Sequence, residues 1–509
     1  MASSGKLLRT FRILSALLFG GGITCLLAGV LHPGWGWMAR LQFLPAVLRL
    51  AGGFTLGNAA IVLGLLLLTW ACGRIYCSVL CPLGIFQDLF IRLRSWLAQA
   101  IRRRNAKRIQ VYAERRKKGE MPARPPRLLP EIRPFPFRPA HTVLRFVLLF
   151  LLLASLFVCG QLLLSLVAPY SAYGRLVRVV AAWATGQSVA GALLPVAGVT
   201  LAVILCCACL WGREGWCNTV CPVGTVLGLV SRHSRLQIRI DDAACTACGR
   251  CSRQCKASCI DVARREVDAS RCVVCFDCLG ACEHGALRYG RPVRDDGRKP
   301  AGKPEDAGRR RFLVTGGLLV GAATRLRAEN HTDGGLAPVA AKQPVQRRER
   351  LVPPGAGSVQ AFYAHCTACQ LCVSNCPNGV LRPSTDPAHL LQPQMGYEKG
   401  WCRPECTACH VCPTGAIRPV RREEKMSIRI GTARVNLDLC FAYTGKAGCG
   451  NCERHCPTGA VTMVAAEDGK RFPVVAESQC IGCGACEYLC PSRPESAITV
   501  HGLHTHIRK

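Results

Sequence analysis

The chain has 509 residues, 35 cysteines, a mean hydropathy of +0.20 and a formal net charge of +34. Half of the residues are hydrophobic, which indicates a membrane portion joined to cysteine-rich soluble portions. The charge would suit a nucleic-acid partner. We expect none, because much of it lies in loops beside membrane spans.

Four apolar stretches in residues 1–240 are long enough to span a bilayer, which needs about 17–25 residues. They are Ile13–Val30, Phe54–Cys72, Phe146–Ala168 and Val189–Trp211. The second loop, residues 92–145, holds sixteen Lys and Arg residues, whereas the first and third loops hold two arginines each. The positive-inside rule therefore places both ends of this four-helix transmembrane domain in the cytoplasm. The spans contain no histidine, so a transmembrane b-type haem is not expected.

An internal repeat follows the second and fourth spans. Residues 73–84 read GRIYCSVLCPLG and residues 212–224 read GREGWCNTVCPVG. Each contains a C-x3-C-P motif, whose two thiols lie one helical turn apart. We predict both pairs, Cys77/Cys81 and Cys217/Cys221, at the cytoplasmic membrane face. They could hold a metal or cluster, act as a redox dithiol, or remain free thiols on a docking surface.

Residues 241–290 contain two runs with C-x2-C-x2-C-x3-C spacing, typical of a ferredoxin with two [4Fe–4S] clusters. The runs are Cys245, Cys248, Cys251, Cys255 and Cys272, Cys275, Cys278, Cys282. In a two-cluster ferredoxin the last cysteine of each run ligates the other cluster. Lys256 and Glu283 stand where such runs usually have proline. Outside the runs, Cys206, Cys207 and Cys209 are expected to be buried core residues and Cys259 a spare thiol.

Residues 291–360 read as a linker that is polar and basic at its start. It contains Arg309-Arg310-Arg311-Phe312-Leu313, which fits the core of a twin-arginine export signal. The apolar run to residue 323 is too short for a normal membrane helix but suits a signal segment. We therefore expect residues 309–323 to direct the following domain to the periplasm. The alternative is a basic linker with a short interfacial helix.

Residues 361–509 supply sixteen further cysteines in four groups, enough for four cubane clusters. The groups are Cys366, Cys369, Cys372, Cys376; Cys402, Cys406, Cys409, Cys412; Cys440, Cys449, Cys452, Cys456; and Cys480, Cys483, Cys486, Cys490. A disulfide framework is disfavoured, because cysteines this close in sequence cannot all reach partners in good geometry. Cys406 and Cys409 with His410 also form a C-x-x-C-H haem attachment motif. Haem would remove two ligands from a cluster, so we favour the cluster.

These motifs support a family resemblance. Residues 1–290, with four spans, two C-x3-C-P motifs and a two-cluster module, resemble NapH, the membrane ferredoxin-type subunit of periplasmic nitrate reductase systems. Residues 309–509 resemble NapG, its four-cluster partner, and the MauN and MauM proteins of methylamine utilisation look similar to the same pair. The chain resembles a natural fusion of the two. The expected fold is therefore membrane α-helical with α+β ferredoxin-like [4Fe–4S] domains.

The resemblance implies a multi-pass protein of the bacterial inner membrane with about six [4Fe–4S] clusters. It would take electrons from the quinol pool, or from a cytoplasmic donor through the first module, and pass them to a periplasmic redox partner of the nitrate-reductase or amine-dehydrogenase type. No nucleophile–base constellation is visible, so we expect an electron carrier or a quinol-dehydrogenase component. Two alternatives stay open. One is an assembly or maturation factor for a copper or other metalloenzyme, and the other keeps all six clusters in the cytoplasm.

Overall fold

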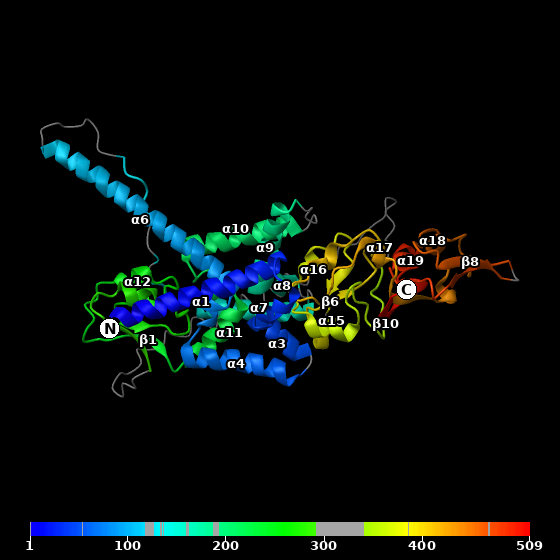
Figure 1. Cartoon of the computed structure of the whole chain (residues 1–509), viewed down its shortest axis with the longest axis horizontal. Coiled ribbons are helices and arrows are strands. Elements are labelled where there is room, and N and C mark those ends of the chain that lie inside the picture. The colour runs from blue at the N-terminus through cyan, green and yellow to red at the C-terminus, as the bar shows by residue number, and fades with distance from the viewer. Residues whose placement is uncertain are drawn as a thin grey trace.

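The computed structural model describes residues 2–52, 54–117, 127–132, 135, 137–158, 162–186, 193–291, 341–384, 386–466 and 469–508. Three units follow one another along its longest axis (Figure 1). A helical unit occupies the middle. The first ferredoxin unit lies beside the N-terminus at one end, and the C-terminal ferredoxin unit forms the other end.

Four apolar helices of the helical unit lie on the predicted spans. They are α1 (Ala2–Ala28), α4 (Leu56–Cys72), α7 (Thr142–Val158) and α10 (Leu193–Trp211), with α8 (Leu162–Val167) continuing the third stretch. Among the described residues, two helical segments are long and apolar enough to cross a membrane, Gly5–Ala28 and Leu194–Trp211. The apolar helices Leu56–Cys72 and Thr142–Ser155 are shorter. The four membrane spans therefore stay a prediction.

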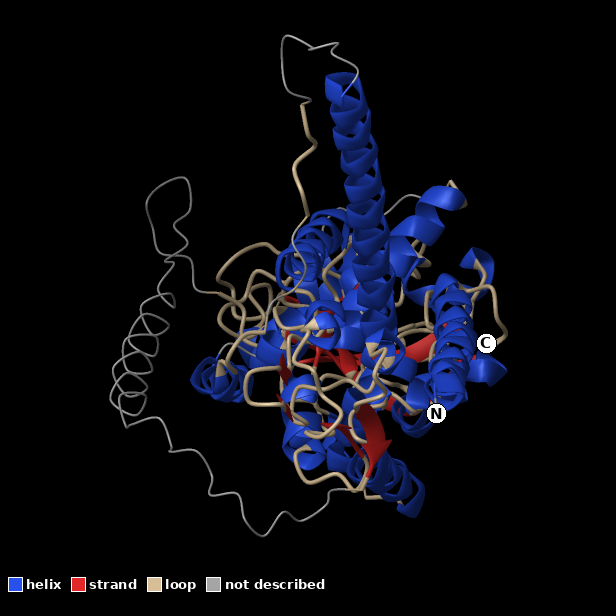
Figure 2. Cartoon of the chain, turned by 90° about the vertical axis from the view of Figure 1, so that its left-hand side faces the viewer, coloured by secondary structure: helices blue, strands red, loops and turns tan. Residues whose placement is uncertain are grey.

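The two halves of the helical unit repeat one arrangement. The first half adds α2 (Trp37–Arg40), α3 (Phe43–Gly52), α5 (Tyr76–Val79) and α6 (Pro82–Lys117), and the second half adds α9 (Pro169–Ala184), the turn η2 (Trp216–Val220) and α11 (Pro222–Ser231). Proline at the first position of α6, α9 and α11 suits a helix start, where no backbone N–H is needed. The far end of α6 projects beyond the bundle (Figure 2).

The first ferredoxin unit consists of short hairpins and helices. Strand β1 (Gln237–Ile240) pairs antiparallel with β4 (Leu287–Gly290), and β2 (Ile260–Asp261) pairs with β3 (Glu266–Val267). The helices α12 (Arg250–Gln254) and α13 (Asp277–Ala281) cover a small core that is rich in cysteine. Helix α13 packs against the N-terminal part of α1, where Leu279 meets Gly5.

The C-terminal unit contains three antiparallel strand pairs, β5 (Leu381–Pro383) with β6 (Pro393–Met395), β7 (Ile428–Val435) with β10 (Ile498–Arg508), and β8 (Val461–Ala465) with β9 (Arg471–Val475). Its helices are α15 (Val359–His365), α16 (Leu371–Ser374), α17 (Arg422–Lys425), α18 (Asn451–Arg454) and α19 (Ala485–Leu489). Leu351 and Val352, which the sequence reading assigned to the linker, are buried in the core of this unit. The twin-arginine-like segment, residues 309–323, lies outside the described residues.

Candidate iron–sulfur sites

Four of the cysteine runs share one backbone conformation. In each, the second residue after the first cysteine and the residue after the second cysteine have positive φ, and a short helix follows at once. These residues are Ala247 and Gly249, Val274 and Phe276, Ala368 and Gln370, and Gly482 and Gly484. Left-handed residues in such loops turn successive backbone N–H groups towards one concave side, a geometry found at iron–sulfur sites. The loops therefore fit the clusters that the spacing predicts.

Two of these left-handed residues have large side chains. Val274 has φ 52° and Phe276 has φ 61°, a conformation that costs an L-residue roughly 1–2 kcal/mol. Both are 3% exposed, and the Phe276 ring packs edge-on against Tyr289 at 5.1 Å between centroids. Strain of this kind persists only where the surrounding structure holds it. The packing around the cysteines therefore imposes the loop conformation.

The last cysteine of each run in the first ferredoxin unit lies with the other run. Burial raises the pKa of the Cys251 thiol, and the nearby thiols of Cys282, Cys245 and Cys248 raise it further. Burial likewise raises the pKa of Cys278, where Cys275, Cys272 and Cys255 add to the effect. Cys282 thus lies near the first run and Cys255 near the second, an arrangement that would let each run complete the other's cluster, and the exchange of ligands stays a prediction.

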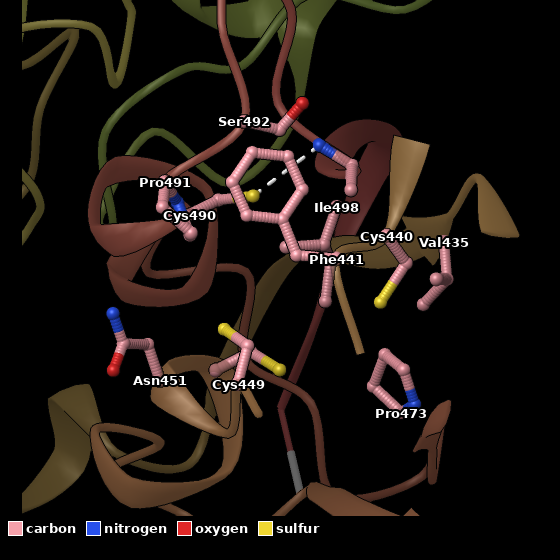
Figure 3. A pocket seen from close by; sticks show the side chains of 12 residues that line it. Val435, Cys440, Phe441, Cys449, Asn451, Pro473, Cys490, Pro491, Ser492 and Ile498 are labelled. Atoms are coloured by element: carbon pink, nitrogen blue, oxygen red, sulfur yellow. Dashed lines mark hydrogen bonds between the residues drawn. The ribbon is translucent and has the colours of Figure 1, made fainter. Parts of the chain in front are cut away.

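The same arrangement of thiols occurs twice in the C-terminal unit. Electrostatic contacts group Cys366, Cys369, Cys372 with Cys412; Cys402, Cys406, Cys409 with Cys376; and Cys480, Cys483, Cys486 with Cys456. The fourth group lines one cavity, where Cys440, Cys449 and Cys452 meet Cys490 (Figure 3). The backbone N–H of Ala497 donates to Cys490 Sγ at 3.3 Å. The irregular runs therefore complete their groups in the same way as the regular ones.

The donor set suits clusters better than single ions. Among the described residues, no three His, Cys, Asp or Glu side chains converge closely enough to hold one metal ion. The described cysteines form no disulfides. A cubane spreads its four thiolates around a larger body, and thiolates are the ligands that iron–sulfur clusters use. The thiols of Cys402, Cys406 and Cys376 lie near that of Cys409, and the cluster stays the prediction favoured over haem.

The four groups of the C-terminal unit follow one another away from the helical unit. The loop of Cys369 packs on α1 and α9, where Ile23 and Tyr170 belong to the same buried cluster. Cys412, which completes that group, is the last cysteine of the run that begins at Cys402. The backbone N–H of Cys402 donates to the carbonyl of Cys483 at 2.9 Å. The groups therefore lie in the order of the 366, 402, 480 and 440 runs.

The C-x3-C-P pairs are buried in the helical unit. Cys77, Cys81, Cys217 and Cys221 belong to one buried cluster with Phe43 and Ala172. Phe43 lies on α3 and Ala172 on α9, and both of these helices contact the C-terminal unit. The chain turns back against the bundle after α4 and α10, where α11 packs on α4 and α7, and the position of the pairs relative to a membrane face stays a prediction. Cys206 and Cys209 are exposed along α10, so they are not the core residues that we expected.

A buried charge network, which sequence reasoning missed, joins the first ferredoxin unit to the helical unit. Asp88 on α6 accepts hydrogen bonds from Arg12 and Arg213, both at 2.9 Å, and its carboxylate lies 3.5 Å from Lys256 Nζ. Lys256 also pairs with Asp277 at 2.6 Å. Lysine at the usual proline position thus has an electrostatic role at this interface. In the sequence, the one sign of this network was that Lys256 stands where such a run usually has proline.

Comparisons with known proteins support the binding of iron–sulfur clusters. A family model described as a 4Fe-4S binding domain matches residues 54–104 and 193–240, which contain both C-x3-C-P pairs. A second, described as a 4Fe-4S dicluster domain, matches residues 447–493. The ferredoxin-type protein NapF of Escherichia coli K12 is 31% identical over 156 residues, which cover 30% of this chain and 86% of NapF. The chain belongs to the Nap/Mau-type ferredoxins.

Other relatives of this Nap/Mau-type polyferredoxin match over shorter shares. The methylamine utilization ferredoxin-type protein MauM of Methylophilus methylotrophus is 32% identical over 28% of this chain and 66% of MauM. The uncharacterized protein MJ0749 of Methanocaldococcus jannaschii is 32% identical over 24% of this chain and 47% of its own length. The chain thus spans about half to two thirds of these curated relatives. No solved structure matches it.

Proposed function

We propose that this polyferredoxin is a membrane-bound electron carrier with six [4Fe–4S] clusters. The observation that supports the proposal is the arrangement of the units. Ferredoxin units lie at opposite ends of a helical unit (Figure 1), and that helical unit exposes many large apolar side chains. Each group of four thiols described above would ligate one cluster, which supplies one-electron redox chemistry. The protein holds the clusters in sequence and shields them from water.

The membrane part of the proposal uses all four apolar stretches as spans. Helix α4 has 17 residues and is about 26 Å long, close to the roughly 30 Å hydrocarbon thickness of a bilayer. The basic second loop belongs in the cytoplasm. The first ferredoxin unit, at the same end of the helical unit as the start of α1, would then be cytoplasmic, and the C-terminal unit periplasmic. In this organisation a NapH-like part, residues 1–290, is fused to a NapG-like part.

Two electron donors fit the two ends of the protein. A cytoplasmic donor would reduce the first ferredoxin unit. Quinol would bind at the opposite end, where a cleft of about 920 Å³ lies between α1, α9 and residues 410–419. That volume suits a small-molecule ligand. The cleft is lined by His32, His365 and His410 and by the thiol-bearing Cys412, so proton acceptors lie beside an electron acceptor. A periplasmic redox protein would receive the electrons.

Three measurements test this function. Anaerobically purified protein should contain at least the iron and acid-labile sulfide of six clusters, about 24 of each. Adding quinol without an acceptor should bleach the cluster absorbance. A topology reporter fused after residue 350 should report a periplasmic position. Protein that is nearly free of iron would refute the proposal, and a cytoplasmic reporter signal would refute its topology.

The maturation alternative makes a different prediction. An electron carrier, when disabled, leaves its periplasmic partner enzyme inactive but with its metal intact. A maturation factor, when disabled by Cys77→Ser and Cys217→Ser, leaves the enzyme without its metal. Metal analysis of the isolated partner enzyme therefore separates the two functions.

A further inference from the structure

The four thiols of the C-x3-C-P pairs meet inside the helical unit. Cys77, Cys81, Cys217 and Cys221 are 5–7% exposed and share one buried cluster. Cys81 interacts electrostatically with the other three. Among the described residues they form no disulfide. Two chain segments separated by more than a hundred residues thus bring four sulfurs to one buried place.

The two halves hold each other in a reciprocal way. Arg74 of the first repeat donates to the backbone carbonyl of Cys217 at 3.2 Å. Arg213 of the second repeat donates to the carbonyl of Cys77 at 2.9 Å. The glycine after each C-P allows a close backbone approach, because a Cβ at Gly84 would lie 2.3 Å from the Cys77 oxygen. Each Gly-Arg and each C-P-x-G therefore fixes the position of a cysteine pair.

The surroundings suit a negatively charged group with hydrogen-bond acceptors. Arg74 and Arg213 are fully buried, and Arg74 Nη2 lies 3.7 Å from Cys77 Sγ. Three buried donors at this place, Arg74 Nε, Gln87 Nε2 and Trp216 Nε1, have no acceptor among the described residues. Buried donors normally have partners. Thiolates and the sulfides of a cluster would provide acceptors.

Helix α1 places this centre between the two ferredoxin units. Gly5 packs against Leu279, next to Cys278 of the first unit, and Leu26 lies in the buried cluster of Cys369 in the C-terminal unit. These contacts are 21 residues apart, or about 32 Å along the helix. Between them, Gly20 packs against Ile85, four residues after Cys81.

Buried side chains connect the four thiols to both neighbours. Cys275, a predicted ligand in the first ferredoxin unit, belongs to the same buried cluster as the four thiols. Ala172 on α9 also belongs to it. Two residues earlier, Tyr170 is buried with Cys369 of the C-terminal unit. Electron tunnelling falls steeply with distance, so a carrier here would divide one long gap into two short ones.

We propose that Cys77, Cys81, Cys217 and Cys221 ligate a seventh iron–sulfur cluster, which connects the two ferredoxin units electronically. This inference rests on the proposed electron-transfer function. The cluster would take one electron from a neighbouring cluster and pass one on to the next, with no bond made or broken. A single ion is disfavoured, because no three of these thiols converge closely enough to bind one. Within the described part of the chain, the thiols of the ferredoxin groups likewise do not converge closely enough to bind a single ion.

The test compares iron and acid-labile sulfide in full-length protein purified anaerobically. The variants are Cys77→Ser, Cys217→Ser and Cys77→Ser/Cys217→Ser, and the matched control is Cys206→Ser, an exposed thiol on α10. We expect wild type to exceed the content of six clusters. The double variant should lose about two irons for a [2Fe–2S] cluster or about four for a [4Fe–4S] cluster. The control should match wild type.

The outcomes separate this inference from the function on which it rests. Wild type with about 24 irons, and no loss in the cysteine variants, would overturn the seventh cluster and leave the six-cluster carrier intact. Zinc or copper in place of the extra iron would also overturn it. Iron-free wild type would refute the carrier itself. If the serine variants are not produced, Gln87→Leu provides a second test, because it removes a hydrogen-bond donor that has no acceptor among the described residues. This variant should shift the visible or EPR spectrum of the extra cluster. An unchanged spectrum would contradict the proposal.

Discussion

Replacing Asp88 by asparagine should separate the first ferredoxin unit from the helical unit. The carboxylate is 6% exposed and faces three cations, Arg12, Arg213 and Lys256. Burial alone would raise the pKa of Asp88, but Arg213, Lys256 and Arg12 hold it below its ordinary value. The group is therefore charged at neutral pH, and its loss leaves buried cations unpaired.

The expected cost follows from the contacts that disappear. Two charge-assisted hydrogen bonds contribute about 1.5–3 kcal/mol each, and removing one partner of a buried ion pair typically costs about 3–5 kcal/mol. We expect Asp88→Asn to destabilise the protein by about 3–5 kcal/mol. This corresponds to a fall in Tm of the order of 10 °C for a domain of about 200 residues.

The assay is thermal unfolding in detergent, followed by the absorbance of the clusters. The matched control is Glu283→Gln, which breaks an ion pair with Arg250 whose side chains are 69% and 50% exposed. Exposed pairs contribute less than about 1 kcal/mol, so the control should leave Tm almost unchanged. Equal effects of the two substitutions would show that the Asp88 network does not hold the units together.

Three further predictions concern the ferredoxin units. Gly484→Ala should lower Tm and cluster content, because a Cβ there would lie 2.3 Å from the Tyr397 ring. The control Ala247→Gly, at a residue with φ 55°, should not lower Tm. A larger fall in Tm for Ala247→Gly than for Gly484→Ala would contradict the left-handed loop conformation. Cys490→Ser combined with Cys449→Ser should lose no more iron than one cluster holds, whereas Cys490→Ser with Cys483→Ser should affect two; equal losses would refute the exchange of ligands. Burial lowers the pKa of His506 to about 4, so stability should fall as the pH drops from about 6.5 towards 4, and His506→Phe should flatten this dependence of Tm on pH.

Short-range spacing explains what could be predicted from the sequence. Ligands two or three residues apart can wrap one cluster, so each run identified its own site. The completion of the Cys440 group by Cys490, and of the Cys480 group by Cys456, depends on how distant loops pack, which spacing does not encode. Which runs are partners could be expected only in the first unit, where the two runs follow each other closely.

The position of the C-x3-C-P pairs could not be predicted for a different reason. Hydropathy marks where α4 and α10 end, but it does not indicate that the chain then turns back into the bundle. That path is held by Arg74 and Arg213, which are fully buried. Their hydrogen bonds to the carbonyls of Cys217 and Cys77 offset the cost of burying them.

Electron flow across a sealed membrane tests the central claim most directly. Loaded protein would be reconstituted in vesicles with the first ferredoxin unit inside, a low-potential reductant enclosed, and an impermeant electron acceptor outside. We predict that the outer acceptor is reduced at a rate proportional to the amount of protein, and that Cys77→Ser/Cys217→Ser abolishes this flow while the six ferredoxin groups stay loaded. Fully loaded wild-type protein that reduces the outer acceptor no faster than empty vesicles would contradict the account.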